Sequence, residues 1–146
     1  MKKILLVLIA LLSVAGIVFA GGNKDAASSN LPTIRLITDD TSIDDKSFNA
    51  AAWRGILEFY GDKNQKNRGQ LYDVVACQTR DMYIPNLKQA ADKGYDLIIT
   101  TGFTFAEAVG EVATLYPDQK FVIIDVDWVG KPNLAEFVYS EEQGSF

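Results

Sequence analysis

The sequence predicts an α/β fold built on a parallel, doubly wound sheet, and three observations support this prediction. Short apolar segments typical of strands alternate with longer segments of helical periodicity, at the spacing of right-handed strand–helix–strand units. The segment FVIIDV at 121–126 is almost unbroken in apolar character, as expected for a parallel strand covered on both faces. Polar residues follow the ends of the strand segments, where open α/β sheets bind small molecules.

The first predicted helix follows a short apolar strand at residues 34–38 and covers residues 46–60. Its apolar residues recur at helical spacing and are expected to face the core. That expected stripe is Phe48, Ala52, Ile56 and Phe59. Gly61 is expected to end the helix.

Two further helices are predicted between the later strands. In the second helix, Pro85 lies near the start, and Gly94 is expected to form the C-terminal stop. Its apolar residues are Ile84, Leu87 and Ala91. In the third helix, Thr104 and Glu107 have the spacing of a capping box. Its expected buried stripe is Phe105, Ala108, Val109, Val112 and Leu115. The remaining strands are predicted at 71–77, 96–101, 121–126 and, as a possible fifth, 135–139.

Residues 1–20 have the pattern of a secretory signal peptide. Lys2 and Lys3 precede an apolar run at 4–18, and Val18 and Ala20 are small residues at the expected cleavage site. The alternative is a membrane anchor, but the apolar run is shorter than the ~20 residues that a spanning helix needs. We therefore expect an exported protein, in the periplasm or at the outer face of the cytoplasmic membrane.

The segment after the predicted cleavage site, residues 21–32, is rich in small polar residues and is expected to be a flexible tether. A bacterial lipoprotein needs a cysteine at the cleavage site, and Gly21 stands there. Lipid anchoring is therefore not supported by this sequence. We expect residues 33–146 to form one globular domain.

The composition excludes several classes of function. The chain has a formal net charge of −5, and removal of the predicted signal peptide takes away two basic residues and no acidic one. An acidic chain is a poor candidate for binding nucleic acid. The absence of histidine rules out histidine-based catalysis and histidine metal sites. Cys77 is the only cysteine, which precludes an intramolecular disulfide, and we expect it to be a small buried apolar residue.

Candidate binding residues follow each predicted strand. Because parallel strands end at one edge of a sheet, these residues are expected to converge there. They are Asp39 and Asp40 with the helix start Lys46, Ser47, Phe48 and Asn49; Gln78, Thr79 and Arg80; Thr101, Gly102 and Phe103; and Asp125, Asp127 and Trp128.

Each of these residues also has a structural interpretation. Asp39 is either an acceptor for a neutral polar ligand or a turn former at the strand end. Phe48 is either a core residue or an aromatic surface on which a flat ring stacks. One of Asp44 and Asp45 is expected to cap the helix. Trp53 and Trp128 are interpreted mainly as packing residues, with Trp128 the better ligand candidate.

Several segments resemble the basic membrane protein family, whose members are substrate-binding proteins of bacterial ABC transporters and include purine nucleoside receptors. The segments are IDDKSFN at 43–49, AAWRG at 51–55, YDLIITTGF at 95–103, FAEAVGEVATLYPDQKFVIID at 105–125 and EEQGSF at 141–146. The similarity extends over the chain from Ile34 onward.

This resemblance implies a type I periplasmic-binding fold, in which two Rossmann-like lobes close on a purine nucleoside. Asp39 then corresponds to the first ligand-binding aspartate, and Phe48 to the aromatic residue that stacks on the purine. Asp125 corresponds to an aspartate that reaches the ligand from the end of the fourth strand. The loop that approaches the site is Gly102 and Phe103. Lys46, Ser47 and Asn49 lie in the family motif as further ligand candidates.

The resemblance also defines the expected partners and limits. The partners are a purine nucleoside and the membrane subunits of an ABC transporter, with no cofactor, no metal and no enzymatic activity. The chain ends at EEQGSF, where family members cross into their second lobe. We therefore expect an N-terminal lobe that lacks its second lobe, binds nucleosides weakly or not at all, and has an exposed face suited to dimerisation. Thr41 also replaces a glycine that is frequent in the family.

Two other functions fit parts of the sequence. A surface-exposed antigen or adhesin needs no small-molecule site. A magnesium-dependent receiver or phosphatase-like domain would use the Asp39–Asp40 pair or the Asp125-Val-Asp127 segment. The predicted export and the third strand's ending in Thr-Thr-Gly rather than an aspartate both disfavour the magnesium-dependent alternative.

Overall fold

The computed structural model describes residues 31–39, 43 and 48–139, and those of them from Pro32 onward belong to one compact unit. The predicted signal peptide and most of the predicted tether lie outside the described residues. So do Asp40, Thr41, Asp44, Asp45, Lys46 and Ser47, together with the closing EEQGSF segment. Across the described ranges, no helix is long and apolar enough to cross a bilayer.

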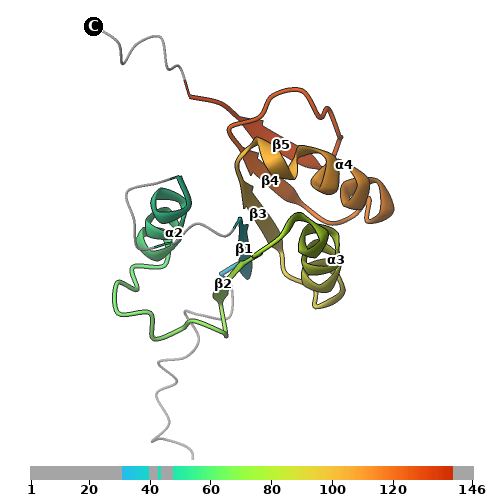
Figure 1. Ribbon diagram of the computed structural model, residues 1–146. Coiled ribbons are helices and arrows are strands. Elements are labelled where there is room, and N and C mark those ends of the chain that lie inside the picture. The colour runs from blue at the N-terminus through green and yellow to red at the C-terminus, as the bar shows by residue number, and fades with distance from the viewer. Residues whose placement is uncertain (1–30, 40–42, 44–47, 140–146) are drawn as a thin grey trace, which may run out of the picture. The chain divides into compact units, whose positions relative to one another are not determined.

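The described residues form a five-stranded parallel sheet, as the sequence predicts (Figure 1). The strand order is β2-β1-β3-β4-β5. The strands are β1 (Ile34–Thr38), β2 (Tyr72–Ala76), β3 (Leu97–Thr101), β4 (Phe121–Ile124) and β5 (Leu134–Phe137). β1 lies inside the sheet and pairs with both β2 and β3, with Ile34 opposite Tyr72 on one side and Leu97 on the other.

Three α-helices connect these strands, and their ends follow local backbone chemistry. They are α2 (Phe48–Phe59), α3 (Tyr83–Asp92) and α4 (Ala106–Leu115). Gly61 follows α2 with φ +62°, and its N–H donates to the carbonyl of Glu58 at 3.0 Å. Gly94 follows α3 with φ +75°, and its N–H donates to the carbonyl of Ala91 at 2.9 Å. Both glycines end their helices as predicted, because glycine adopts this left-handed conformation without steric cost.

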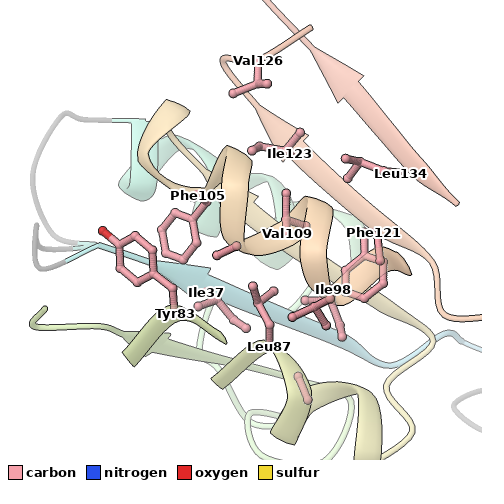
Figure 2. Close-up of a cluster of buried hydrophobic side chains, with 14 of the residues drawn as sticks. Ile37, Tyr83, Leu87, Ile98, Phe105, Val109, Phe121, Ile123, Val126 and Leu134 are labelled. Carbon is pink, nitrogen blue, oxygen red and sulfur yellow. The ribbon is translucent and has the colours of Figure 1, made fainter. Parts of the chain in front are cut away.

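The larger core cluster lies where α3 and α4 pack on the sheet (Figure 2). Strand residues on this face alternate with those on the other face, as the period of two requires. The cluster includes Ile37, Leu87, Ile98, Phe105, Val109, Val112, Phe121, Ile123 and Val126, all of them fully or almost fully buried. Figure 2 shows Phe105 and Tyr83 lying face to face, with ring centroids 3.8 Å apart.

The smaller cluster lies between α2 and the opposite face of the sheet. It contains Ile34, Leu36, Trp53, Ile56 and Tyr72. Its polar edge is organised by the buried carboxylate of Asp62, which accepts hydrogen bonds from the Tyr72 hydroxyl and from the backbone N–H groups of Lys66 and Asn67 at 2.7–3.0 Å. These bonds fix the segment that connects α2 to β2.

The predicted buried stripe of the first helix is wrong by about one residue. The residues of α2 that are buried are Asn49, Ala50, Trp53 and Ile56, whereas Phe48 and Phe59 are exposed. Only Ile56 is fully buried from the predicted set. α2 has apolar residues on more than one face, and the bulky Trp53 ring takes the place against the sheet, edge to face with Tyr72. Packing, and not spacing, therefore selects the buried face.

The predicted capping box of the third helix is also wrong. The residue before α4 is Phe105, in helical conformation and without a side-chain cap. A single 3₁₀ turn at Phe103–Phe105 precedes it. Thr104 lies inside this turn, with its hydroxyl 3.4 Å from that of Tyr83. Leu115, the last residue of α4, is exposed and not part of the buried stripe.

Candidate functional site

The carboxyl edge of the sheet gathers most of the predicted ligand residues. Asp39 follows β1, Gly102 follows β3, and Asp125 follows β4, while Phe48 opens α2. Because all five strands are parallel, these strand ends lie at one edge of the sheet. Lys46 and Ser47, also predicted as ligand residues, lie outside the described residues.

A buried polar chain connects three elements at this edge. The amide nitrogen Nδ2 of Asn49 donates to Oδ1 of Asp39 at 2.8 Å. The hydroxyl of Thr101 donates to Oδ1 of Asn49. Asn49 is only 4% exposed and Thr101 is fully buried, so the chain joins the ends of β1 and β3 to the first turn of α2. A buried polar chain of this kind fixes the orientation of each member.

Phe48 lies next to these hydrogen-bonded side chains and is not a core residue. Its side chain is 43% exposed. One face of the ring stacks on Tyr139, with ring centroids 5.4 Å apart and an interplanar angle of 24°. The core interpretation of Phe48 is therefore wrong, and the ring is presented at the edge where the strands end. Tyr139 was not among the predicted site residues, because the sequence placed it inside the possible fifth strand at 135–139, whereas that strand ends at Phe137 in the structure.

The Gly102–Phe103 loop has a backbone that only glycine adopts easily. Gly102 has φ +91° and ψ 147°, and its N–H donates to the carbonyl of Ile124 at 2.9 Å. A side chain at this φ would be strained. The conformation turns the chain directly into the 3₁₀ segment, and it leaves the Phe103 side chain exposed.

Asp125 also has an unusual backbone, which shortens the fourth strand. Its φ is +75°, and its N–H donates to the carbonyl of Phe137 at 2.6 Å. A non-glycine residue in this region costs of the order of 1–3 kcal/mol, and such residues concentrate at functional sites. The predicted strand 121–126 therefore ends at Ile124.

Further residues of the predicted edge line a separate pocket of about 390 Å³. It is lined by Arg80, Phe103, Thr104, Ala106, Glu107, Trp128 and Val129. Trp128 is exposed, whereas Trp53 packs in the core, as expected. Among the described residues, no group of three acidic or cysteine side chains is placed to hold a metal ion.

Cys77 lies just beyond β2 and is almost completely buried, which confirms its predicted role as a small apolar residue. Burial raises the pKa of its thiol to about 11, although the nearby charge of Arg35 acts in the opposite direction. The thiol is therefore protonated at neutral pH and is not a candidate nucleophile.

Comparison with known proteins identifies the family of this chain. Residues 33–146 match the family described as ABC transporter substrate-binding protein PnrA-like (Bmp). The chain belongs to this family. The match confirms the resemblance seen in the sequence motifs.

Two curated relatives illustrate the relationship. The chain is 33% identical over 149 residues to basic membrane protein A of Borreliella burgdorferi, covering all of this chain and 41% of that protein. It is 28% identical over 144 residues to the ABC transporter nucleoside-binding protein BmpA of Lactococcus lactis, covering 94% of this chain and 40% of that protein. The chain thus spans about two fifths of the length of these relatives.

Solved structures give the same fold. An ABC transporter solute-binding protein of Aeropyrum pernix K1 superposes with a TM-score of 0.61 at 29% identity, covering 76% of this chain and 30% of that one. A fragment of a lipoprotein from Peptoclostridium difficile also has a TM-score of 0.61, at 25% identity, and covers 78% of this chain and 89% of that one. The described sheet is accordingly a lobe of the periplasmic-binding type.

Proposed function

We propose that this chain forms one wall of a purine nucleoside site in an extracytoplasmic substrate-binding protein of an ABC transporter. The observation that carries the proposal is the Asp39–Asn49–Thr101 hydrogen-bond chain beside the half-exposed ring of Phe48. The name of the L. lactis relative, a nucleoside-binding protein, supports the choice of ligand. Membership of a substrate-binding protein family favours this function over the magnesium-dependent alternative.

The chemistry of the wall suits a flat, neutral ligand. A purine ring would stack on the open face of Phe48, and stacking of a base on an aromatic side chain contributes about 1–3 kcal/mol. The carboxylate of Asp39 would accept hydrogen bonds from ligand N–H or O–H groups, which are stronger when the acceptor is charged. Asp39 and Asp125 would both repel a phosphate group. The proposed site therefore selects nucleosides over nucleotides.

The proposed site needs no catalytic step, because stacking and hydrogen bonding are sufficient for capture and release. We propose that the protein is exported through the signal peptide predicted at residues 1–20 and delivers its ligand to the membrane subunits of the transporter. Relatives in Pyrococcus species bear the name lipoprotein, in agreement with a location outside the cytoplasm.

We expect weak binding by this chain by itself. One aromatic face and a few hydrogen bonds leave the ligand half in water, where polar contacts are weakened by the high dielectric constant. A dissociation constant near 1 mM corresponds to about −4 kcal/mol, which is the range that a single stack and its hydrogen bonds supply.

The proposal is tested by NMR titration of the 146-residue chain with adenosine and inosine at millimolar concentrations. The amide signals of Asp39, Phe48, Asn49 and Gly102 are expected to shift together along one binding curve. Gly94 follows α3, away from these strand ends, and is the internal control whose signal stays fixed. Shifts spread over both regions, or no shift at all, would contradict the proposed site.

A pair of variants on one helix isolates the stacking contribution. Phe48→Ala is expected to weaken adenosine binding more than tenfold, the equivalent of about 1.4 kcal/mol. Phe59→Ala, which removes another exposed ring at the other end of α2, is expected to leave the affinity within twofold. Equal effects of the two variants would show that Phe48 does not contact the ligand.

A further inference from the structure

The stack of Phe48 on Tyr139 joins two parts of the chain that are far apart in sequence. Phe48 is the first residue of α2, and Tyr139 lies two residues after the end of β5. Their ring centroids are 5.4 Å apart and their planes are inclined by 24°. Both values are within the range of favourable offset stacks between aromatic side chains.

This aromatic pair lies outside the hydrophobic core. The side chain of Phe48 is 43% exposed and that of Tyr139 is 54% exposed, and neither belongs to the two core clusters. Tyr139 stacks on one face of the Phe48 ring, and 43% of the Phe48 surface remains accessible to solvent. A ring held from one side and open on the other is suited to receive a second flat ring.

The polar chain at the sheet edge lies beside the same ring. Asn49 directly follows Phe48, and its amide group is held between Asp39 and Thr101. These two bonds hold the Asn49 side chain in place directly after Phe48. Tyr139 is the aromatic residue that stacks on it within the described part of the chain.

We propose that Tyr139 is a positioning residue of the ligand site, which holds the Phe48 ring in the orientation that accepts the ligand's ring on its open face. This inference rests on the proposed function of the site. Preorganisation of the ring removes a side-chain ordering cost that binding would otherwise include. The same contact ties the site to the segment in which the chain leaves β5.

The test compares adenosine binding by NMR titration of the 146-residue chain and three variants. Tyr139→Ala is expected to weaken binding about three- to tenfold, the range expected for one side chain ordered on binding. Tyr139→Phe keeps the stacked ring and is expected to remain within twofold of the native chain. Phe137→Ala removes an exposed ring from the end of β5 that does not stack on Phe48, and it is also expected to remain within twofold.

A second measurement needs no ligand. In protein with labelled phenylalanine, the ring protons of Phe48 are expected to shift in Tyr139→Ala and to keep their native positions in Phe137→Ala, because a stacked tyrosine ring displaces the resonances of its neighbour. Native-like Phe48 resonances in Tyr139→Ala would show that the stack does not form in solution, and that result would overturn the inference.

The two measurements separate the inference from the proposed function. If Phe48→Ala loses binding while Tyr139→Ala keeps native affinity, the function stands and the positioning role is wrong. Tighter binding by Tyr139→Ala would mean that Tyr139 competes with the ligand, and it would also overturn the role. If the native chain binds no nucleoside, the proposed function fails, and the Phe48 ring resonances decide whether Tyr139 positions that ring.

Discussion

The two faces of the sheet are built differently. The face covered by α3 and α4 has a closed apolar core in which Phe105, Val109 and Phe121 are fully or almost fully buried. On the face covered by α2, an open apolar hollow of about 280 Å³ lies beside the helix. It is lined by Ile34, Ala52, Gly55, Ile56, Phe59, Ile99 and Ile124. The α3–α4 face is therefore closed, whereas the α2 face combines a buried cluster around Trp53 and Tyr72 with this open hollow.

The largest expected difference between the faces concerns two phenylalanines on neighbouring strands. Phe121 of β4 is 1% exposed, whereas Phe137 of β5 is 57% exposed. Phe121→Ala is expected to lower the free energy of unfolding by about 3–5 kcal/mol, because it leaves a cavity in a packed core. Phe137→Ala is expected to change it by no more than about 0.5 kcal/mol. Urea unfolding of both variants checks the contrast, and similar losses would show that the two faces are equally closed.

For two glycines inside helices, substitution by alanine is expected to change the free energy of unfolding in opposite directions. A Cβ added at Gly110 of α4 would lie 3.0 Å from Cγ1 of Val129, whereas one added at Gly55 of α2 would meet nothing within 4 Å. Gly55→Ala is expected to stabilise the protein by roughly 0.5–1 kcal/mol through helix propensity. Gly110→Ala is expected to destabilise it by up to about 2 kcal/mol, because overpacking exceeds that gain. Thermal unfolding measures both changes, and a gain at both positions would contradict the crowding of α4.

The loss of folding stability at acidic pH is expected to come from Asp62, which lies on the α2 face. Hydrogen bonds from the Tyr72 hydroxyl and from the N–H of Asn67 lower the pKa of Asp62. A carboxyl with a lower pKa in the folded state stabilises the protein fully above its unfolded pKa of about 4, and this contribution is lost as the pH falls through the folded pKa. Asp62→Asn is therefore expected to be less stable than the native chain at pH 7, with a gap that narrows below about pH 4.

The control for this acid effect is Asp118→Asn, which changes an exposed aspartate in the turn after α4. Urea midpoints measured from neutral to acidic pH are expected to show the narrowing gap for Asp62→Asn and no such trend for the control. A gap that stays constant over this pH range would show that the Asp62 carboxylate does not stabilise the folded state.

The reactivity of the Cys77 thiol is a probe of how tightly the α3–α4 face is closed, and it needs no substitution. Burial raises the pKa of its thiol to about 11, against about 8.5 for an ordinary cysteine. Near pH 8, the folded protein therefore has a much smaller population of the reactive thiolate than the unfolded chain. This difference by itself is expected to slow the reaction with a disulfide reagent by about two orders of magnitude. Absorbance of the released thiol measures the rate, and native and unfolded protein reacting equally fast would indicate that the α3–α4 face opens easily.

The sequence predicted the sheet well and the helix faces less well. The apolar strand segments and the helix-ending glycines Gly61 and Gly94 depend on local backbone chemistry, which is readable from neighbouring residues. The buried face of α2 is not readable in this way, because Phe48, Trp53 and Phe59 lie on competing apolar faces. Trp53 is selected by packing against the sheet, where it joins Leu36 and Tyr72 in one cluster. The capping box at Thr104 was wrong because Gly102 turns the chain into a 3₁₀ segment first.

At the site, the sequence by itself predicted where the strands end. Because parallel strands end at one edge of the sheet, it also predicted that Asp39, Asn49, Phe48 and Gly102 lie there. The motifs also identified the family. Only the tertiary structure decided that Asn49 bridges Asp39 and Thr101 and that Tyr139 stacks on Phe48. The physical reason is that these contacts join distant segments, whose meeting depends on strand order and helix packing and leaves no periodic pattern in the sequence.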